Sequence, residues 1–207
     1  MAIPHPRRTG AVIVPLKGFS KAKERLSSVF DADSRSLLAK LTAEGVIDAT
    51  LKLPDVTRVV VVTDDESCAE WARSKGTEVL IETGGLNPSV AVAYRHLGDS
   101  VDWVMICHAD IVHPERLAAI PSPGDAQVIL VRDRHRDGTN VMVLPADEEF
   151  DFHYGAGSAE AHRQECAERG LKPIEVIDTL LGIDVDTPAD LAMLPEPLKQ
   201  RLGLAQK

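Results

Sequence analysis

Short apolar runs, several of them rich in valine and isoleucine, alternate along this chain with longer segments of helical periodicity. The run at 58–63, RVVVVT, has the continuous apolar character of a parallel strand covered on both faces. Strand–helix–strand alternation predicts an α/β fold with a mostly parallel, doubly wound sheet. The expected strands are 11–15, 58–63, 78–81, 102–107, 127–131, 141–144 and 174–177, of which 141–144 is compatible with an antiparallel direction.

Helices are expected between these strands from apolar spacing and from end signals. Asp33 or Ser34 is predicted to cap the first helix, and Thr187 to cap a C-terminal helix that begins at Pro188. The other helices are expected over 66–75 with Gly76 as a stop, from about Pro88 towards Leu97, and from Ser158 to Gly170.

The length of 207 residues fits one α/β domain, and apolar residues at 44% with charged residues at 27% are typical of a globular chain. Neither an internal repeat nor a low-complexity tract marks a boundary. We therefore expect a single domain over 1–207, with its core at about 11–203.

Charge and composition exclude several classes of partner. A net charge of −9 and only 4% aromatic residues disfavour binding to nucleic acid or to an anionic membrane surface. The N-terminal apolar stretch is too short for a secretory leader or a membrane span. The three cysteines form no CxxC pair, which favours a reducing compartment. These features predict a soluble, cytoplasmic protein.

A basic loop follows the first strand, where ligands of open α/β sheets lie. Lys17, Lys23 and Arg25 gather positive charge beside Gly18, whose backbone N–H can approach a phosphate closely. The loop matches neither the Walker P-loop nor the dinucleotide GxGxxG pattern. Either a phosphate-binding loop or a solvated basic turn explains this spacing.

Three carboxylates follow later apolar runs. Asp110 follows the run at 102–107 as the last residue of His108-Ala109-Asp110. Asp184 and Asp186 stand two residues apart, a spacing that puts both side chains on one face of an extended segment. Mg²⁺ prefers such oxygen ligands, and phosphoryl transfer needs a cation near the developing charge. Capping of a following helix is the alternative for Asp110 and for Asp186.

Two further loops carry small and polar residues. Gly85 and Asn87 precede a helix, and the Asn87 amide suits a base edge or a ribose as well as a simple helix cap. Thr139 ends a polar loop, while Gly155 and Ser158 lead into a helix whose first turn is expected to offer free amide donors and a hydroxyl to a phosphate or carboxylate. Helix capping is again the alternative for Ser158. A nucleophile elbow is absent, so catalysis by positioning and charge fits best.

The segments VPLKGFSKAKERL, GGLN, HAD, DGTN, YGAGS and IDVDTPADL resemble, in order, the CofC-type guanylyltransferases of coenzyme F-420 biosynthesis. The resemblance spans about 13–191 and implies a single-domain, MobA-like (GT-A-like) nucleotidyltransferase fold. It also implies transfer of GMP from GTP to a three-carbon phospho-acid, with Mg²⁺ and release of pyrophosphate.

The resemblance implies a role for each candidate residue. It implies metal ligands at Asp110, Asp184 and Asp186, and phospho-acid contacts at Thr139, Gly155 and Ser158. Charge stabilisation on the GTP phosphates is expected from Lys17, Lys23 and Arg25, and further GTP contacts from Gly18, Gly85 and Asn87.

The sequence departs from the family pattern after the GGLN segment and at 108–113, both near the expected site. The acceptor therefore stays open among 2-phospho-L-lactate, phosphoenolpyruvate and 3-phospho-D-glycerate. Two other functions also stay open. One is a nucleotidyltransferase that uses CTP, or that acts on a sugar phosphate or molybdopterin; the other is a nucleotide-binding module without catalysis. A homodimer is compatible with such a domain.

Overall fold

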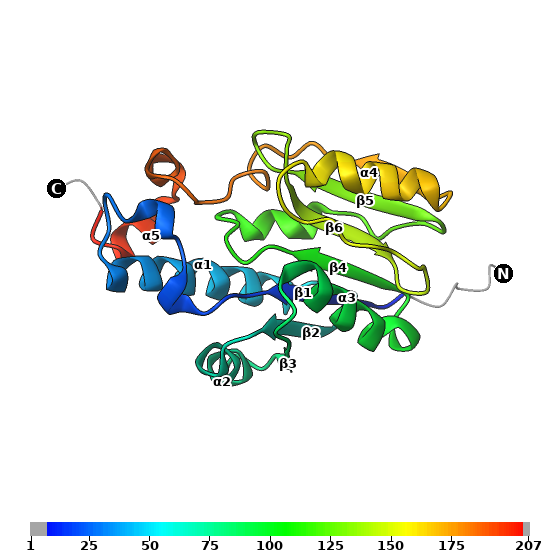
Figure 1. The fold of residues 1–207 in the computed structure, drawn as a ribbon, viewed down its shortest axis with the longest axis horizontal. Coiled ribbons are helices and arrows are strands. Elements are labelled where there is room, and N and C mark those ends of the chain that lie inside the picture. Colours follow the sequence, from blue (N-terminus) through cyan, green and yellow to red (C-terminus); the bar gives the residue numbers. More distant parts are fainter. Residues whose placement is uncertain (1–7, 205–207) are drawn as a thin grey trace.

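The apolar runs form one seven-stranded sheet with the strand order β3-β2-β1-β4-β6-β5-β7 (Figure 1). The computed structural model describes residues 8–204. The short N-terminal apolar stretch weighed above as a leader lies within them and forms most of the first strand. The strands are β1 (Gly10–Pro15), β2 (Val56–Thr63), β3 (Glu78–Ile81), β4 (Trp103–Cys107), β5 (Gln127–Arg132), β6 (Thr139–Pro145) and β7 (Lys172–Glu175).

All neighbouring strands are parallel except at β6, which runs antiparallel to both β4 and β5. The expected mostly parallel sheet is confirmed, as is the antiparallel direction considered for 141–144. The last strand was predicted two residues too late. It begins at Lys172 because the ladder with β5 runs from Gln127↔Lys172 to Leu130↔Glu175.

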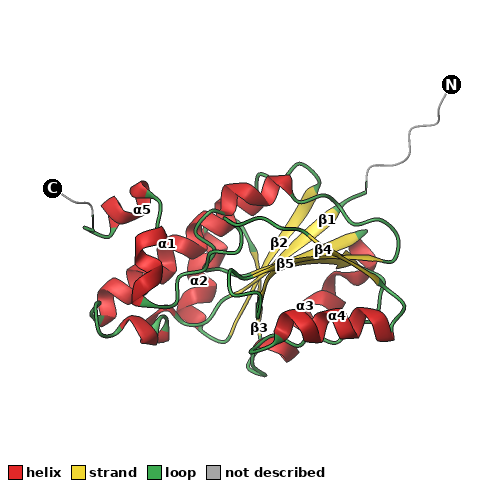
Figure 2. Cartoon of the chain, turned by 90° about the horizontal axis from the view of Figure 1, so that it is seen from above, coloured by secondary structure: helices red, strands yellow, loops and turns green. Residues whose placement is uncertain are grey.

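The longer helices cover both faces of the sheet. In Figure 2, α3 (Leu86–Leu97) and α4 (Ser158–Glu168) lie on one face, and α1 (Ala32–Thr50) and α2 (Glu66–Ser74) on the other. Within β1 the side chains alternate between two cores: Ile13 packs with Val90 and Leu97 of α3, whereas Val12 packs with Val46 of α1. Burial on both faces explains why these strands are continuously apolar.

Short helices complete the described chain. The structure also shows which residues cap α1 and the helix that follows Thr187. The shorter elements are η1 (Phe19–Lys21), η2 (Glu24–Leu26), η3 (Gly98–Ser100), η4 (Pro114–Ala119), η5 (Pro188–Met193) and α5 (Glu196–Arg201). The predicted cap of α1 was wrong: Asp31 accepts a 2.8 Å hydrogen bond from Ser34 N, and Asp33 lies inside the first turn. Thr187 is confirmed as an N-cap, but the helix that it begins is a short 3₁₀ helix.

A third, smaller core joins the C-terminal segment to the first half of the chain. Leu26 and Leu38 pack there with Val185 and Leu194. This contact carries the segment around Asp184 and Asp186 back to the edge of the sheet at which β1 and β4 end, so it positions two of the candidate metal ligands.

Two further observations bear on the expected environment of the chain. Cys68, Cys107 and Cys166 are all buried and free of disulfides. Among residues 8–204, the structure has no helix with both the length and the apolar character that a membrane crossing requires.

Candidate active site

The carboxyl ends of β1, β2, β3 and β4 open onto a cavity of about 510 Å³, a volume within the usual range of ligand sites. Because β6 is antiparallel, its first residue, Thr139, lies at this same edge of the sheet: the neighbouring Asn140 carbonyl accepts a 3.1 Å hydrogen bond from His108 N, just after β4. The sheet therefore presents both the nucleotide and the acceptor candidates on one side.

Half of the predicted site residues line this cavity, namely Lys17, Lys23, Arg25, Gly85, Asp110 and Asp186. Asp184 lies beside them in the carboxylate cluster described below. The remaining predicted residues, Gly18, Asn87, Thr139, Gly155 and Ser158, lie outside the cavity lining.

Lys23 is the central cation of the site. Its Nζ donates to Asp110 Oδ2 at 2.7 Å and to Asp186 Oδ1 at 3.0 Å, and its side chain is only 8% exposed. Burial opposes the charged form, but the two carboxylates outweigh burial and raise the pKa of Lys23. The backbone of Lys23 has a φ of 56°, a left-handed conformation that is unfavourable for a lysine and that turns this side chain into the site. Arg25 reaches Asp186 more loosely, with 3.9 Å between Nη1 and Oδ2.

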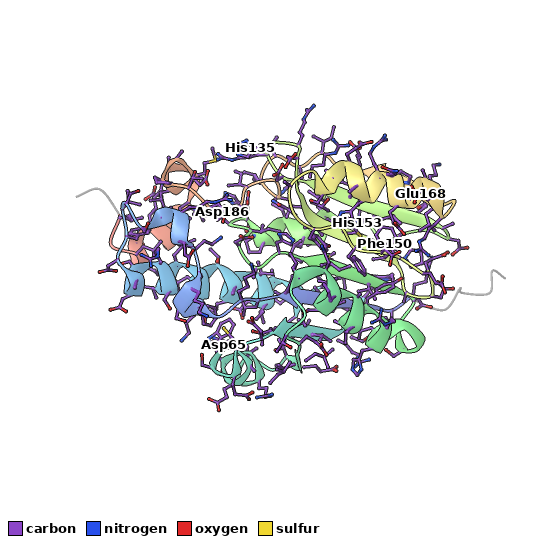
Figure 3. All side chains as sticks on the ribbon, in the orientation of Figure 1. Asp65, His135, Phe150, His153, Glu168 and Asp186 are labelled. Carbon is purple, nitrogen blue, oxygen red and sulfur yellow. The ribbon has the colours of Figure 1, made fainter. Side chains whose placement is uncertain are left out.

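Asp110, Asp184 and Asp186 each offer one carboxylate oxygen, and these oxygens lie within 4.8 Å of one another. An isolated antiparallel bridge joins Asp184 to Ile111, next to Asp110, while Val185 between the two aspartates is buried in the third core. The sequence-based expectation that Asp184 and Asp186 approach a common point is thus matched by the geometry. Figure 3 shows Asp186 on the side of the molecule that carries α5.

The cluster fits a divalent cation in its charge and in its free oxygen atoms. Asp110 Oδ1 is buried without a hydrogen-bond partner, although its other oxygen is bonded to Lys23. Burial, together with the charges of Asp110 and Asp186, raises the pKa of Asp184 to about 6. For Asp110, burial acts in the same direction, but Lys23 and His108 outweigh it and lower the pKa. The three carboxylates bring more negative charge than Lys23 offsets, and carboxylate oxygens are ligands that Mg²⁺ prefers.

Asp190 holds the loop that carries Asp186. Its Oδ2 accepts from the backbone N–H of Asp186 at 2.9 Å and from that of Thr187 at 2.6 Å, and its Oδ1 is paired with Arg134. The Asp190 side chain is 3% exposed, so these contacts replace its solvation. The position of Asp186 therefore depends on a buried carboxylate four residues further along.

Two residues expected at the GTP have structural contacts. The Asn87 amide bonds the backbone of Tyr154 twice, as an acceptor from Tyr154 N at 2.7 Å and as a donor to Tyr154 O at 3.1 Å. Asn87 thereby ties the start of α3 to the segment that precedes α4. Gly18 packs against Asp65, since a Cβ at Gly18 would lie 2.7 Å from Asp65 Oδ2.

Thr139, Gly155 and Ser158 come together at the start of α4. Thr139 N donates to Ser158 Oγ at 3.0 Å, and Ser158 N donates to Gly155 O at 3.2 Å. Gly155 has a φ of 133°, which favours glycine at this turn.

Three of the amides expected to be free at the start of α4 are occupied within the chain. Asp137 accepts from Gly157 N through its carboxylate at 3.0 Å and from Ala159 N through its carbonyl at 2.9 Å. Together with the bond from Ser158 N, these contacts occupy the amides of three consecutive residues, because the loop before β6 folds over the helix start. The hydroxyls of Thr139 and Ser158 are further donors at this point, and both residues are buried.

Sequence reasoning missed several functional candidates. Asp64 and Glu82 follow β2 and β3 and line the cavity, so the strand-end rule that selected Asp110 also applies to them. His162 bonds Thr139 Oγ1 at 3.0 Å, and no sequence spacing signals this contact.

Comparisons with known proteins agree on one family. A family model described as "Guanylyl transferase CofC like" matches residues 10–195. A phosphoenolpyruvate guanylyltransferase from Sphaerobacter thermophilus is 31% identical over 194 residues, covering 90% of this chain and 92% of the relative. One from Conexibacter woesei is 32% identical over 203 residues, covering 92% of this chain and 89% of the relative.

Solved structures support the fold. A nucleotidyl transferase from Methanothermobacter superposes with a TM-score of 0.61 at 14% identity, covering 94% of this chain and 99% of that structure. A 4-diphosphocytidyl-2C-methyl-D-erythritol synthase superposes with a TM-score of 0.63 at 14% identity, covering 97% and 100%. At this identity the likeness establishes a nucleotidyltransferase fold.

Proposed function

Because the chain belongs to the family of CofC-like guanylyl transferases, we propose that it transfers GMP from GTP to the phosphate of phosphoenolpyruvate. The observation that carries the proposal is the cluster of Asp110, Asp184 and Asp186 facing Lys23 at the mouth of the cavity. The choice of acceptor rests on the names of the relatives. Such a step would supply coenzyme F-420 biosynthesis, the pathway implied by the family resemblance.

The strand order suggests how GTP lies in the cavity. Glu82 follows β3 and Asp64 follows β2, whereas Lys17 follows β1 and Asp110 follows β4. Among the described residues, the carboxylates of Glu82 and Asp64 have no hydrogen-bond or ion-pair partner, although the backbone N–H of Glu82 donates to Thr63 O at 2.9 Å. Three strand spacings separate β3 from β4, roughly 14 Å. We place the base at the acidic end and the phosphates at the end with Lys17 and Lys23.

Glu82 is the residue that we assign to base selection. Guanine carries two donors, N1–H and the 2-amino group, on the edge that pairs with other bases, and a carboxylate is purely an acceptor. Adenine and cytosine each place an acceptor nitrogen on that edge, which a carboxylate repels. This complementarity favours GTP over ATP and CTP.

The reaction then proceeds by positioning and charge. An oxygen of the acceptor phosphate attacks the α-phosphorus of GTP and forms a new P–O bond, while the bond to the oxygen that bridges the α- and β-phosphates breaks. Both electrons of the broken bond leave with pyrophosphate. A general base is unnecessary, because a phosphate monoester is largely ionised at neutral pH. Mg²⁺, held by Asp110, Asp184 and Asp186, would offset the negative charge of the transferring group.

Side chains of the basic loop stabilise the charge that shifts to the leaving group. Lys17 and Arg25 line the cavity, where their charged groups can pair with phosphate oxygens. Lys23 holds the carboxylate cluster together and shares its charge between Asp110 and Asp186. Thr139 and Ser158 offer hydroxyl donors to the phosphate or carboxylate of the acceptor.

Phosphorus NMR of the product tests this assignment directly. Incubation with GTP, Mg²⁺ and phosphoenolpyruvate should replace the monoester resonance of the acceptor by two coupled diphosphate resonances, together with pyrophosphate. Formation of GDP and inorganic phosphate alone would indicate hydrolysis. GTP binding without any new resonance would support the non-catalytic nucleotide-binding module.

A further inference from the structure

His162 is a fully buried histidine on α4 whose two ring nitrogens are both hydrogen-bonded. Its Nε2 lies 2.9 Å from His153 N, and its Nδ1 lies 3.0 Å from Thr139 Oγ1. A backbone N–H can only donate, so Nε2 must accept the hydrogen bond from His153. The proton of a neutral ring is then on Nδ1, which donates to Thr139 Oγ1.

The surroundings of His162 keep the ring neutral. Burial, reinforced by the nearby His153 and His108, lowers the pKa of His162 to about 3, even though Glu165 acts in the opposite direction. Tyr154 packs edge-on against the ring, with 4.8 Å between the centroids. Figure 3 shows His153, whose backbone N–H donates to His162, beside α4.

A bulge in β6 brings Thr139 to this histidine. Val131 pairs with Val141 but the next residue, Arg132, pairs with Thr139, so Asn140 is an extra residue in the strand. Asn140 instead donates to Leu181 O at 3.1 Å on the opposite face. The bulge therefore turns Thr139 towards α4, and bulges next to active sites commonly re-aim a side chain in this way.

The hydroxyl oxygens of Thr139 and Ser158 each already accept one hydrogen bond. Thr139 Oγ1 accepts from His162, and Ser158 Oγ accepts from Thr139 N. Within residues 8–204, neither hydroxyl hydrogen has an acceptor in the hydrogen-bond network. Since the amides of Gly157, Ser158 and Ala159 are occupied, these two hydrogens remain as side-chain donors for an anionic ligand at this point.

We propose that His162 is a positioning residue that fixes the Thr139 hydroxyl as a hydrogen-bond donor to the anionic acceptor. The inference rests on the proposed function, in which Thr139 binds the phospho-acid. His162 itself touches no substrate; it acts by supplying Nδ1–H to Thr139 Oγ1, which leaves the hydroxyl hydrogen free to point away from α4.

Two isosteric variants separate this role from simple packing. His162→Asn keeps a donor near the position of Nδ1, whereas His162→Gln keeps an acceptor near the position of Nε2 but loses the donor to Thr139. Steady-state kinetics on the full chain should show that His162→Gln raises the KM for phosphoenolpyruvate roughly 10-fold, with the KM for GTP changed less than about 2-fold. His162→Asn should stay close to the wild-type values. Equal effects of the two variants, or equal shifts of both KM values, would overturn the proposal.

Thr139→Val distinguishes a failure of the inference from a failure of the acceptor site. If Thr139→Val raises the KM for phosphoenolpyruvate and His162→Gln does not, the positioning role is wrong and the acceptor site stands. If Thr139→Val leaves that KM unchanged, the acceptor assignment itself fails. Should the His162 variants not fold, ¹⁵N NMR of the wild-type histidine rings decides: an Nδ1–H tautomer of His162 is expected, and an Nε2–H tautomer contradicts the proposal.

Discussion

At the scale of single residues, ion pairs between the buried Lys23 and the carboxylates of Asp110 and Asp186 organise the site. Lys23 gives the carboxylates of Asp110 and Asp186 a counter-charge within the chain, and Asp110 Oδ1 keeps a free acceptor position. A buried carboxylate without enough positive charge is unfavourable, so the cluster is poised to gain from a divalent cation. These residues should therefore matter more for turnover than for folding.

Replacing a cluster carboxylate tests this directly. Asp110→Asn and Asp186→Asn should each lower the rate of pyrophosphate release at least about 100-fold, because one oxygen ligand and its charge are lost. Circular dichroism should show both variants folded, since asparagine has the same shape. Wild-type rates at ordinary Mg²⁺ concentrations in either variant would contradict the metal assignment.

His162 also predicts a pH dependence of stability. Its pKa in the folded protein is about 3, below the value of about 6.5 in an unfolded chain. Between these values the unfolded chain binds the proton and the folded protein does not, so stability falls as the pH drops from about 6.5 towards 3. From pH 7.5 to 5.5 this histidine should remove about 1.4 kcal/mol from the free energy of unfolding.

Urea unfolding of the wild type and of His162→Gln at both pH values measures that contribution. The variant has no titrating ring, so the gap in stability between the two proteins should change by the amount given above. Because the other ionisable groups are common to both proteins, their effects largely cancel in this comparison. A gap that does not change with pH would show that the pKa of His162 is the same in the folded and unfolded states, and would contradict the lowered pKa.

At the scale of elements, strand β6 and the buried Asp190 position the residues of the candidate site. The antiparallel direction of β6 brings its first residue to the edge at which β4 ends, and the extra residue Asn140 turns Thr139 towards α4. Asp190 fixes the loop of Asp186 by accepting hydrogen bonds from the backbone N–H groups of Asp186 and Thr187. Local geometry at these points, rather than helix or strand content, sets the positions of the functional groups.

Asp190→Ala should weaken both the fold and metal binding. Loss of a buried carboxylate that accepts from two amides and pairs with Arg134 should lower the free energy of unfolding by roughly 2–4 kcal/mol. The Mg²⁺ concentration for half-maximal activity should rise about 10–100-fold, because residues that orient metal ligands have effects of that size.

Arg134→Met is the matched control for Asp190. It removes the ion pair but leaves Asp190 Oδ2 bonded to the amides of Asp186 and Thr187. We expect its Mg²⁺ requirement to stay near the wild-type value. An equal rise in both variants would mean that the ion pair, and not the hydrogen bonds to the loop, positions Asp186.

The predictability of each element follows from the range of the interactions that form it. Continuous apolar runs predicted the central strands, such as β1 and β4, because burial on both faces requires apolar residues at successive positions. The edge strand β7 (KPIE) is only partly buried, and its bounds were predicted two residues too late. The cap at Asp31 was missed because Asp31, Asp33 and Ser34 are all suitable capping residues within four positions. The bond between His162 and Thr139 and the contact of Asn87 with Tyr154 depend on tertiary packing, which no spacing in the sequence signals.

At the scale of the whole molecule, the proposed function divides the sheet edge into a nucleotide side and an acceptor side. The ends of β3, β2, β1 and β4 carry Glu82, Asp64, Lys17 and Asp110 in that spatial order, and β6 with α4 supplies Thr139 and Ser158 beyond them. With a net charge of −9, the chain attracts anionic substrates only through its local cations. The homodimer and the cytoplasmic location expected from the sequence stay predictions.

The nucleotide side makes its own prediction through Glu82. Inosine triphosphate lacks the 2-amino donor of guanine, so Glu82→Gln should reduce the preference for GTP over inosine triphosphate about 10-fold in kcat/KM. Asp64→Asn, at the neighbouring strand end, is the control and should keep the wild-type preference. A loss of preference in Asp64→Asn alone would move the base contact to β2.

The most direct test of the proposed guanylyltransferase activity is pyrophosphate release from GTP and Mg²⁺ with phosphoenolpyruvate, 2-phospho-L-lactate and 3-phospho-D-glycerate supplied separately. We expect rapid release with phosphoenolpyruvate, little with the other two acids, and none with phosphoenolpyruvate in Asp110→Asn. Release with a different acid would keep the guanylyltransferase activity and correct its acceptor. No release with any of the three acids, in a protein that binds GTP tightly, would contradict the central claim.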